Sequence, residues 1–452
     1  MSRLPPASPP SQSTEQSSCT GCSRKRAECT AKFKSEACQR RHWKVHKAVC
    51  KPPHPDSWHD SLSSLGHPAA HIELIKAFRG TSAVQPTGLR FLTLPLPPRD
   101  PQGTTECIFT DGMKKAILAQ PGFPVRVLRP RIPACRIALA PGAGLGMFAT
   151  RPLRMLELIH AERPLLLAPV PEGEPDAVTT GEYEEWLAKA LDRMLPYQAD
   201  AYRALANAKG DAAPPLTGIL QTNGWSTRAE LYEIAEHLPL DVAAVGTVAS
   251  RVNHSCAPNA TLLFRTGSLS MPLIATRAIA AGEQITVSYI DIFVPAVQRQ
   301  QQLAKYSFPC ACVACMDSAA SDARRAWIQR ERRFTDKALF ERWTTDLSLP
   351  DRHLIDPLCD LLQLIADEGA FGFELVSHIL SRLARVWSAL GHEQLTIMST
   401  ALYLDVLSAQ WGEQETQLER LVIEVVWIAC YWKRRIRQQL SELRRKPSSP
   451  EE

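Results

Sequence analysis

The most distinctive segment of this chain reads Asn253-His254-Ser255-Cys256-Ala257-Pro258-Asn259. Asn253 and His254 offer hydrogen-bond donors and acceptors to a polar ligand, because their side chains carry both kinds of group. The serine and proline in this segment favour a tight, non-regular backbone. Taken by itself, the segment also fits an ordinary turn rich in asparagine and proline. Other parts of the chain are needed to decide between these two interpretations.

A glycine-rich segment lies earlier in the chain, directly after a predicted strand at 136–140. It reads Gly142-Ala143-Gly144-Leu145-Gly146-Met147-Phe148-Ala149. Glycine lets a ligand approach the backbone closely. The segment also fits the dinucleotide-binding fingerprint G-x-G-x-x-A, but that fingerprint requires a helix immediately afterwards. Pro152 would interrupt such a helix, so we interpret the segment as a turn or a ligand-binding loop.

Two further segments carry chemically useful residues. The first combines a predicted turn at Gly282-Glu283 with a predicted strand from Ile285 to Tyr289, where an isolated tyrosine would most simply be a core residue. The second holds three closely spaced cysteines and reads Cys310-Ala311-Cys312-Val313-Ala314-Cys315. Thiolates bind Zn²⁺, which takes four nitrogen or sulfur ligands in a structural site. A fourth ligand is absent from the immediate neighbourhood of these cysteines.

Together these segments resemble the catalytic centre of SET-domain protein-lysine methyltransferases, and the string at 250–259 is the closest match. The resemblance implies an α+β fold class: a SET fold of short β-sheets with a pseudoknot and a post-SET zinc flap, an N-terminal small zinc finger and a C-terminal α-helical domain. It implies S-adenosyl-L-methionine as the cofactor. It also implies that the side-chain amine of a lysine, in a histone or another protein, is the substrate.

The resemblance also implies roles for single residues. Tyr289 aligns with the catalytic tyrosine of the family, and Tyr306 would line the channel of the substrate lysine. The implied cofactor-binding residues are Gly144, Leu145, Gly146, Asn223, Ser250, Asn253, His254, Tyr289 and Phe308. An ordinary surface turn remains the alternative for Asn223. A core aromatic remains the alternative for Tyr306 and Phe308.

The chemistry of such a site can be argued physically. A free lysine has a pKa near ~10.4, so at neutral pH it is mostly protonated and not nucleophilic. A narrow apolar channel lowers that pKa, because it disfavours the ammonium form. What remains is the in-line alignment of amine, methyl group and sulfur, which is a positioning effect. The phenol of Tyr289 can orient the amine.

In the related SET-and-MYND methyltransferases, the cysteine of the Asn-His-Ser-Cys string completes the zinc site of the flap. The resemblance therefore implies that Zn²⁺ is held by Cys256, Cys310, Cys312 and Cys315. The metal would tie the flap to the cofactor loop. Four thiols without a metal are the alternative.

The N-terminal cysteines resemble a MYND zinc finger, and the stretch from Cys38 to Cys50 is its most specific part. The implied ligands of two zinc ions are Cys19, Cys22 and Cys38 in one site and Cys29, His46 and Cys50 in the other. Each site is one ligand short. Lys34 stands where another cysteine is expected, and a protonated lysine cannot bind a metal. His42 or water would have to substitute, so two, one or no zinc ions are all compatible with the sequence.

The chain has 452 residues, which suits two or three domains. The predicted organisation is 1–18 disordered, 19–50 a degenerate MYND-like finger, 51–134 a linker with a helical segment at 72–78, 135–292 the SET domain with a helical insert at about 160–245, 293–316 the zinc flap, 317–446 a helical domain and 447–452 a tail. Apolar residues at helical spacing predict the insert and the helical domain, which is either separate or a helical cap packed on the first domain. Examples in the insert are Leu187, Leu191, Met194 and Leu195, and examples in the helical domain are Leu358, Leu361, Leu362 and Ile365, then Leu418, Leu421, Val422 and Val425.

The composition of the chain limits the cellular compartments and binding partners that we expect. No run of about 20 apolar residues predicts a membrane helix, and the N-terminus lacks the apolar stretch of a signal peptide. We therefore expect a nuclear or cytoplasmic protein, in which the clustered members of its thirteen cysteines are metal ligands rather than disulfides. The net charge of +5 does not by itself indicate nucleic-acid binding. The expected partners are a protein substrate and, at the finger, a Pro-rich peptide, and the expected oligomeric state is a monomer.

A binding module is the alternative to an enzyme. Such a protein would keep the SET and MYND scaffold with little catalysis and serve transcription-related complexes. A scaffold without activity would tolerate the loss of Tyr289 or Asn253, yet all four segments of the catalytic centre are intact. The sequence therefore favours the enzyme.

Overall fold

The computed structural model describes residues 60–61, 89–95, 104–120, 123–170, 181–227, 241–412 and 415–445. The chain divides into two units, Met1–Asp60 and Ser61–Glu452. Apart from Asp60, the described residues all belong to the second unit. The disordered segment predicted at 1–18, the finger at 19–50, the helical segment at 72–78 and the tail at 447–452 lie outside the described residues.

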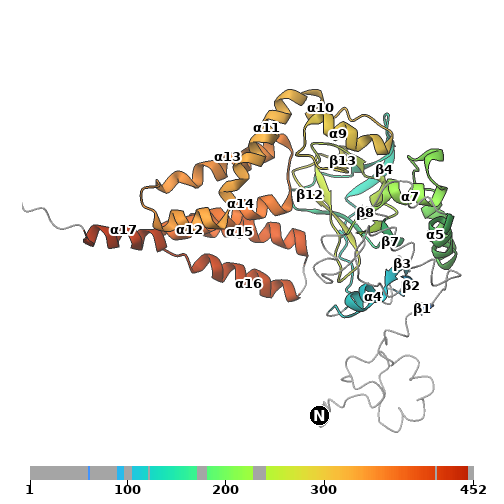
Figure 1. The fold of residues 1–452 in the computed structure, drawn as a ribbon, viewed down its shortest axis with the longest axis horizontal. Coiled ribbons are helices and arrows are strands. Elements are labelled where there is room, and N and C mark those ends of the chain that lie inside the picture. The colour runs from blue at the N-terminus through green and yellow to red at the C-terminus, as the bar shows by residue number, and fades with distance from the viewer. Residues whose placement is uncertain are drawn as a thin grey trace, which may run out of the picture. The chain divides into compact units, whose positions relative to one another are not determined.

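The strands of the second unit form small sheets (Figure 1). A four-stranded sheet has the order β10-β13-β5-β4, with bounds Asn253–His254, Gln284–Val287, Gly144–Ala149 and Cys135–Ala140. A three-stranded sheet has the order β11-β12-β6, with bounds Ala260–Leu262, Met271–Ala275 and Leu158–Glu162. A larger sheet contains, in order, β2-β3-β7-β9-β8, with bounds Leu89–Pro95, Thr104–Thr110, Leu166–Val170, Asp241–Val245 and Trp225–Ser226. The short strand β1 (Asp60–Ser61) spans the boundary between the two units.

The glycine-rich segment turns and then continues as a strand. Gly142 and Gly144 have φ values of +71° and +67°, in the left-handed region that glycine adopts without steric cost. Strand β5 follows at once and pairs antiparallel with β4, which confirms the strand predicted at 136–140. Because a strand and not a helix follows the glycines, the dinucleotide-binding fingerprint is excluded.

The predicted helical insert is a mixture of helices and strands. Its helical elements are α5 (Gly181–Arg193), α6 (Pro196–Arg203), the 3₁₀ helix η4 (Gly210–Ala212) and α7 (Pro215–Asn223). Leu187 and Leu191 of α5 are fully buried in one cluster with Leu166 of β7 and Val245 of β9. The strands at both ends of the range 160–245 differ from the helical prediction. Leu195, expected on the same apolar face, is exposed.

The C-terminal region is helical, as predicted, and its helices gather on one side of the strands (orange to red in Figure 1). The α-helices are α9 (Ala296–Leu303), α10 (Val313–Met316), α11 (Ser318–Glu331), α12 (Lys337–Thr345), α13 (Ile355–Glu368), α14 (Phe373–Leu390), α15 (Glu393–Trp411), α16 (Glu415–Ala429) and α17 (Arg434–Arg445). Short 3₁₀ helices η6 (Ala304–Tyr306), η7 (Arg332–Thr335) and η8 (Asp351–His353) lie between them. Earlier in the chain, α4 (Asp111–Leu118) follows β3, and the 3₁₀ helix η5 (Ala249–Arg251) precedes β10.

The helical region shares its hydrophobic core with the strands. Leu358, Leu361 and Ile365 of α13 are buried, as their spacing predicts, because they line one face of the helix. The same buried cluster includes Ile274 of β12 and Ile292. The helices are therefore packed onto the strand-rich region rather than forming a separate domain.

Helix α16 differs from its predicted packing. The helix exists, but Val422 and Val425 on its apolar stripe are exposed. Among the described helices, none is both long enough and apolar enough to cross a bilayer.

Candidate active site and cysteine cluster

The four-stranded sheet brings together segments that are far apart in the sequence. Strand β10 pairs parallel with β13, with Asn253 opposite Thr286. Strand β13 pairs antiparallel with β5, with Gln284 opposite Phe148. The Asn-His string, the glycine-rich segment and the strand before Tyr289 are thus neighbours in one sheet. This convergence is what the resemblance required.

Gly146 occupies a point where three segments meet. A Cβ atom at this position would lie 2.7 Å from Nε2 of Gln284, 2.9 Å from Cβ of Ala140 and 3.0 Å from Nδ2 of Asn253. The Asn253 amide also donates a 3.2 Å hydrogen bond to the carbonyl of Leu145. Only glycine lets Asn253 approach β5 this closely without a shift of its neighbours.

Asn259 holds the end of the Asn-His string against β13. Its amide nitrogen donates to Oε1 of Glu283 at 3.0 Å and to the carbonyl of Gln284 at 2.8 Å. Its amide oxygen accepts a 2.8 Å bond from the backbone N–H of Thr286. The side chain is buried, and no role was predicted for it. The one signal in the sequence is that an asparagine closes the string.

Tyr289 lies at the centre of an aromatic group. Its hydroxyl donates a 2.5 Å hydrogen bond to the carbonyl of Val252, and its ring centroid lies 5.0 Å from that of Tyr306. Burial raises the pKa of Tyr289 well above its ordinary value, and the neighbouring Tyr306 adds to the shift. The phenol is therefore a neutral hydrogen-bonding group at physiological pH and not a base.

His254 links Tyr289 to the cysteines. Its Nδ1 accepts a 3.1 Å bond from the backbone N–H of Tyr289, and its Nε2 lies 3.3 Å from Sγ of Cys256. Burial lowers the pKa of His254 to about 4, although Cys312 opposes the shift. Because Nδ1 accepts, the neutral ring carries its proton on Nε2, directed at the sulfur.

A cavity of about 840 Å³ opens beside these residues, within the range usual for small-molecule sites. The predicted site residues that line it are Gly144, Leu145, Asn223, Ser250, Asn253, Tyr289, Tyr306 and Phe308. Gly146 and His254 adjoin this group through the contacts given above but do not line the cavity. Eight of the residues singled out from the sequence therefore line one cavity.

Asn223 and Ser250 are held in place by backbone carbonyls. The amide nitrogen of Asn223 donates to the carbonyls of Ala206 and Ile219 at 2.7 and 2.8 Å. The hydroxyl of Ser250 donates to the carbonyl of Gly246 at 2.6 Å. These bonds fix both side chains at the cavity wall.

The cavity is also lined by residues that the sequence did not predict. They include Ala208 from the insert and Lys305 from η6. Two hydrogen bonds of 2.8 Å join these parts: Nζ of Lys209 donates to the carbonyl of Lys305, and the hydroxyl of Ser307 donates to the carbonyl of Ala208. No motif marks these residues, because the contacts join segments nearly 100 residues apart.

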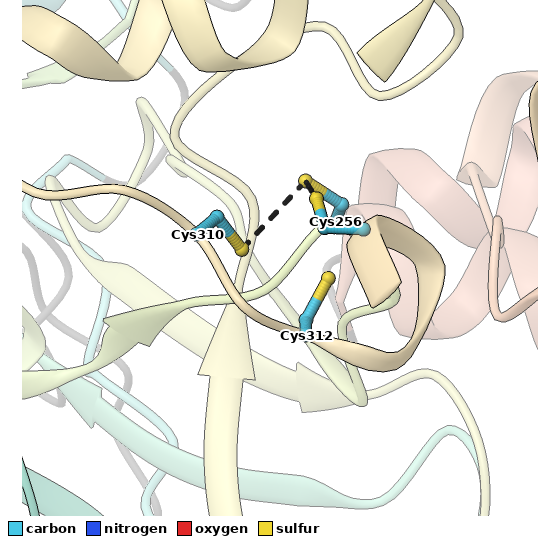
Figure 2. Close-up of side chains that lie close together, drawn as sticks. Cys256, Cys310 and Cys312 are labelled. Atoms are coloured by element: carbon cyan, nitrogen blue, oxygen red, sulfur yellow. Dashed lines mark hydrogen bonds between the residues drawn. The ribbon is translucent and has the colours of Figure 1, made fainter. Parts of the chain in front are cut away.

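The four cysteines assigned to the flap converge on one point. The sulfur atoms of Cys256, Cys310, Cys312 and Cys315 all lie within 4.8 Å of one another. Figure 2 shows the side chains of Cys256, Cys310 and Cys312 pointing toward a common centre. Cys256 lies 3.5 Å from the sulfur of Cys315 and 4.0 Å from that of Cys310. Four sulfur donors at this spacing fit a tetrahedral structural zinc site.

The thiols of the cluster shift one another's pKa. Hydrogen bonds with Cys310 and Cys312 raise the pKa of Cys256 far above its ordinary value. Hydrogen bonds from Cys256 and Cys310 lower the pKa of Cys312 strongly. A bound metal would replace these hydrogen bonds, because it coordinates each sulfur as thiolate.

The flap is also braced by side chains of α9. The Gln300 amide donates to the carbonyl of Cys310 at 2.8 Å and accepts from its N–H at 3.0 Å. The buried Arg299 donates to Asp322 at 2.9 Å and to the carbonyl of Ala314 at 3.4 Å. The predicted finger ligands, Cys19, Cys22, Cys29, Cys38, His46 and Cys50, lie outside the described residues and stay predictions.

Comparison with known proteins finds a family match for the part of the chain that contains most of these residues. Residues 144–290 match the family described as the SET domain, which is the family that the motifs resemble. The short sheets and the C-terminal helices agree with the predicted α+β fold class.

Several curated proteins with similar sequences are named as lysine methyltransferases or as SET and MYND proteins. The chain is 28% identical over 183 residues to histone-lysine N-methyltransferase set5 of Schizosaccharomyces pombe, which covers 40% of this chain and 50% of that protein. It is 44% identical over 70 residues to SET domain and MYND-type zinc finger protein 6 of the same organism, covering 15% and 14%. It is 40% identical over 67 residues to histone-lysine N-methyltransferase SMYD3 of Mus musculus, covering 15% of each chain. The matches thus span half of the first relative and much less of the other two, and they agree with the SET-and-MYND resemblance.

Proposed function

We propose that this protein is an S-adenosylmethionine-dependent protein-lysine N-methyltransferase. One observation carries the proposal: the phenol of Tyr289 lines the same cavity as Gly144, Leu145, Asn253 and Phe308. A pocket for the cofactor and a group able to orient an amine would then share one space. The relatives named as histone-lysine methyltransferases support lysine as the acceptor.

The residues of the cavity would divide the work as follows. The backbone at Gly144 and Leu145, with the Asn253 side chain, would bind the polar amino-acid end of the cofactor. The ring of Phe308 would pack on the adenine. When bound, the cofactor supplies an electrophilic methyl group.

Tyr289 and Tyr306 would position the substrate lysine. Their rings lie 5.0 Å apart, and both phenols have a raised pKa because they are buried. A lysine placed against these two rings loses hydration, which lowers the pKa of its amine. The phenol oxygen of Tyr289, whose proton is donated to the carbonyl of Val252, can then accept a hydrogen bond from the amine and leave the nitrogen lone pair free to face the methyl group. Alignment of this kind is a large part of the catalysis available to such a site.

The cysteine cluster would hold one Zn²⁺. The ligands would be the sulfurs of Cys256, Cys310, Cys312 and Cys315, and the Nε2–H of His254 would donate to the thiolate of Cys256. The metal would keep Tyr306 and Phe308 of the flap against the loop that carries Asn253.

A labelled-methyl transfer assay tests the proposal. The full-length protein would be incubated with radiolabelled cofactor and either core histones or a peptide array. Transfer that requires lysine in the acceptor and disappears in Tyr289→Phe supports the proposed function. Tyr197→Phe is the matched control, because Tyr197 is exposed on α6. The absence of lysine methylation on every acceptor, with cofactor bound, would refute it.

A further inference from the structure

A buried arginine of the helical region reaches the cysteine cluster. Arg325 of α11 has a side chain that is 1% exposed. Its Nη2 donates a 2.8 Å hydrogen bond to the backbone carbonyl of Cys256, and its Nη1 donates to the carbonyl of Ile292. The guanidinium therefore ties the ligand loop to the chain just after Tyr289. Both acceptors are backbone carbonyls, so they survive any change of side chain at those positions.

The charge of Arg325 is balanced by Glu368 at the end of α13. Nε of Arg325 donates to Oε1 of Glu368 at 2.8 Å and to the hydroxyl of Ser321 at 3.0 Å. The same carboxylate accepts from the hydroxyl of Ser321 and, through Oε2, from Nε of Arg324 at 2.5 Å. Burial alone would raise the pKa of Glu368, but the bonds from Ser321, Arg324 and Arg325 lower it. The buried pair is thus charged and fully hydrogen-bonded, the condition under which such a pair is tolerated.

The end of α13 also packs closely against the same loop. Gly369 follows Glu368 and ends the helix with φ +62°. A Cβ atom there would lie 3.1 Å from Cβ of Ala257, the residue after Cys256. The ligand loop is therefore held by hydrogen bonds on one side and by close packing on the other.

We propose that Arg325 and Glu368 are positioning residues that hold Cys256 as a metal ligand and couple the C-terminal helices to the cofactor cavity. The carbonyl of Cys256 fixes the backbone from which its sulfur projects. Asn253, which lines the cavity, lies three residues earlier in the same loop. Loss of the clasp formed by Arg325, Glu368 and Ser321 would loosen the metal and the cofactor together. This inference rests on the proposed zinc site.

The chemistry explains why arginine is needed. Its planar fork presents several N–H donors in fixed directions, so one side chain can bind two carbonyls and a carboxylate at once. Lysine keeps the charge for Glu368 but cannot span all three acceptors. Arg324→Lys is the matched control, because Arg324 binds the same carboxylate and is 39% exposed.

The test compares full-length wild type, Arg325→Lys, Arg324→Lys and Cys312→Ser. Metal content is measured by elemental analysis, zinc release with a chelating dye, affinity for S-adenosylhomocysteine by calorimetry, and thermal midpoint by scanning fluorimetry. A phase of zinc release that is present in wild type and missing in Cys312→Ser comes from the metal of the cysteine cluster. This comparison distinguishes that metal from zinc bound elsewhere in the protein. If wild type lacks that phase of zinc release, the zinc proposal is refuted. The calorimetry then still tests whether Arg325 affects the affinity of the cavity for S-adenosylhomocysteine.

The expected result is release about tenfold faster and affinity about tenfold weaker in Arg325→Lys, the scale typical of residues that support metal ligands. Arg324→Lys should match wild type in both. A purely structural role would lower the thermal midpoint of Arg325→Lys and leave release and affinity at wild-type values below that midpoint, which overturns the proposal. Equal effects of both lysine variants would also overturn it. Should Arg325→Lys not fold, Ser321→Ala decides the question: it removes one hydroxyl of the clasp, and unchanged release and affinity there refute the inference.

Discussion

The hydroxyl of Tyr289 is bonded to the backbone carbonyl of Val252, the residue immediately before Asn253. The tyrosine that would orient the substrate is thus tied to the loop that would bind the cofactor. The backbone N–H of the same tyrosine is bonded to the ring of His254. Two hydrogen bonds, both donated by Tyr289, fix the relative positions of the two halves of the site.

Replacement of Tyr289 by Phe should separate catalysis from binding. The variant keeps the ring and its packing on Tyr306 but loses the hydroxyl, so we expect methyl transfer to fall by about a hundredfold, the loss that small misalignments produce. Calorimetry with S-adenosylhomocysteine should give an affinity within a few-fold of wild type. A variant that keeps wild-type turnover would show that the phenol has no catalytic role.

Replacement of Cys312 by Ser should remove the metal of the cluster. We expect one equivalent of zinc to be lost and cofactor binding to weaken at least about tenfold, because the ligands also support the cavity. Cys359→Ser is the matched control, since Cys359 is an exposed free thiol on α13. Equal zinc content in wild type and Cys312→Ser would rule out the proposed ligand set.

Replacement of Gly146 by Ala should strain the centre of the sheet. The added methyl would meet Cβ of Ala140 and the amide of Asn253, so we expect a loss of about 1–3 kcal/mol in the free energy of unfolding, the usual cost of overpacking. Gly372→Ala is the control, because a Cβ there meets nothing within 4 Å. Chemical denaturation measures both. An equal effect of the two substitutions would show that the close approach at Gly146 is unimportant.

Replacement of Asn259 by Ala should destabilise the fold more than an ordinary polar substitution. It would leave the N–H of Thr286 and the carbonyl of Gln284 without their side-chain partner, and each unsatisfied buried group costs about 1–3 kcal/mol. We therefore expect a loss of about 3 kcal/mol in the free energy of unfolding, measured by denaturant titration. A loss below about 0.5 kcal/mol would place Asn259 among neutral surface positions.

Replacement of Glu368 by Gln should give a pH-dependent loss of stability. The pKa of this carboxyl is lowered in the fold, so its stabilisation is fully present above the pKa of the unfolded chain and is lost as pH falls through the lower folded pKa. Wild type should therefore exceed the variant by about 3 kcal/mol near pH 7. The difference should shrink as the pH is taken below the ordinary carboxyl value of 4.5. A difference that stays constant down to the lowest pH at which both proteins remain folded would contradict an ionised Glu368.

Local sequence signals identified the pieces of the site well. The strand at 136–140, the SET-domain motifs and the amphipathic pattern of α13 are all present as predicted. Each has a signal within a few residues: alternation for the strand, a motif string for the site, and helical spacing for α13. The assignment of Cys256 to the cysteine cluster came from family resemblance, and the geometry agrees with it.

Long-range contacts could not be read from the sequence. Strand β7 (Leu166–Val170) begins in the apolar run Leu165-Leu166-Leu167-Ala168, and a short buried strand of this kind has no alternation to distinguish it from helix. Arg325 reads locally as one more polar residue of a surface helix, yet its carbonyl partner at Cys256 is 69 residues away. The exposed apolar stripe of α16 follows helical spacing as well as the buried stripe of α13 does. The spacing of apolar residues predicts the apolar face of a helix, but it does not predict which element packs against that face.

The hydrophobic cluster that joins Ile274 and Ile292 to the C-terminal helices determines how far the chain can be shortened from its C-terminus. A truncation that ends with the flap would keep every residue of the family match. It would also uncover both isoleucines and remove the counter-charge and packing behind Cys256. Such a fragment should be poorly soluble, so the smallest soluble unit that keeps the site has to extend well past the boundary that sequence comparison draws.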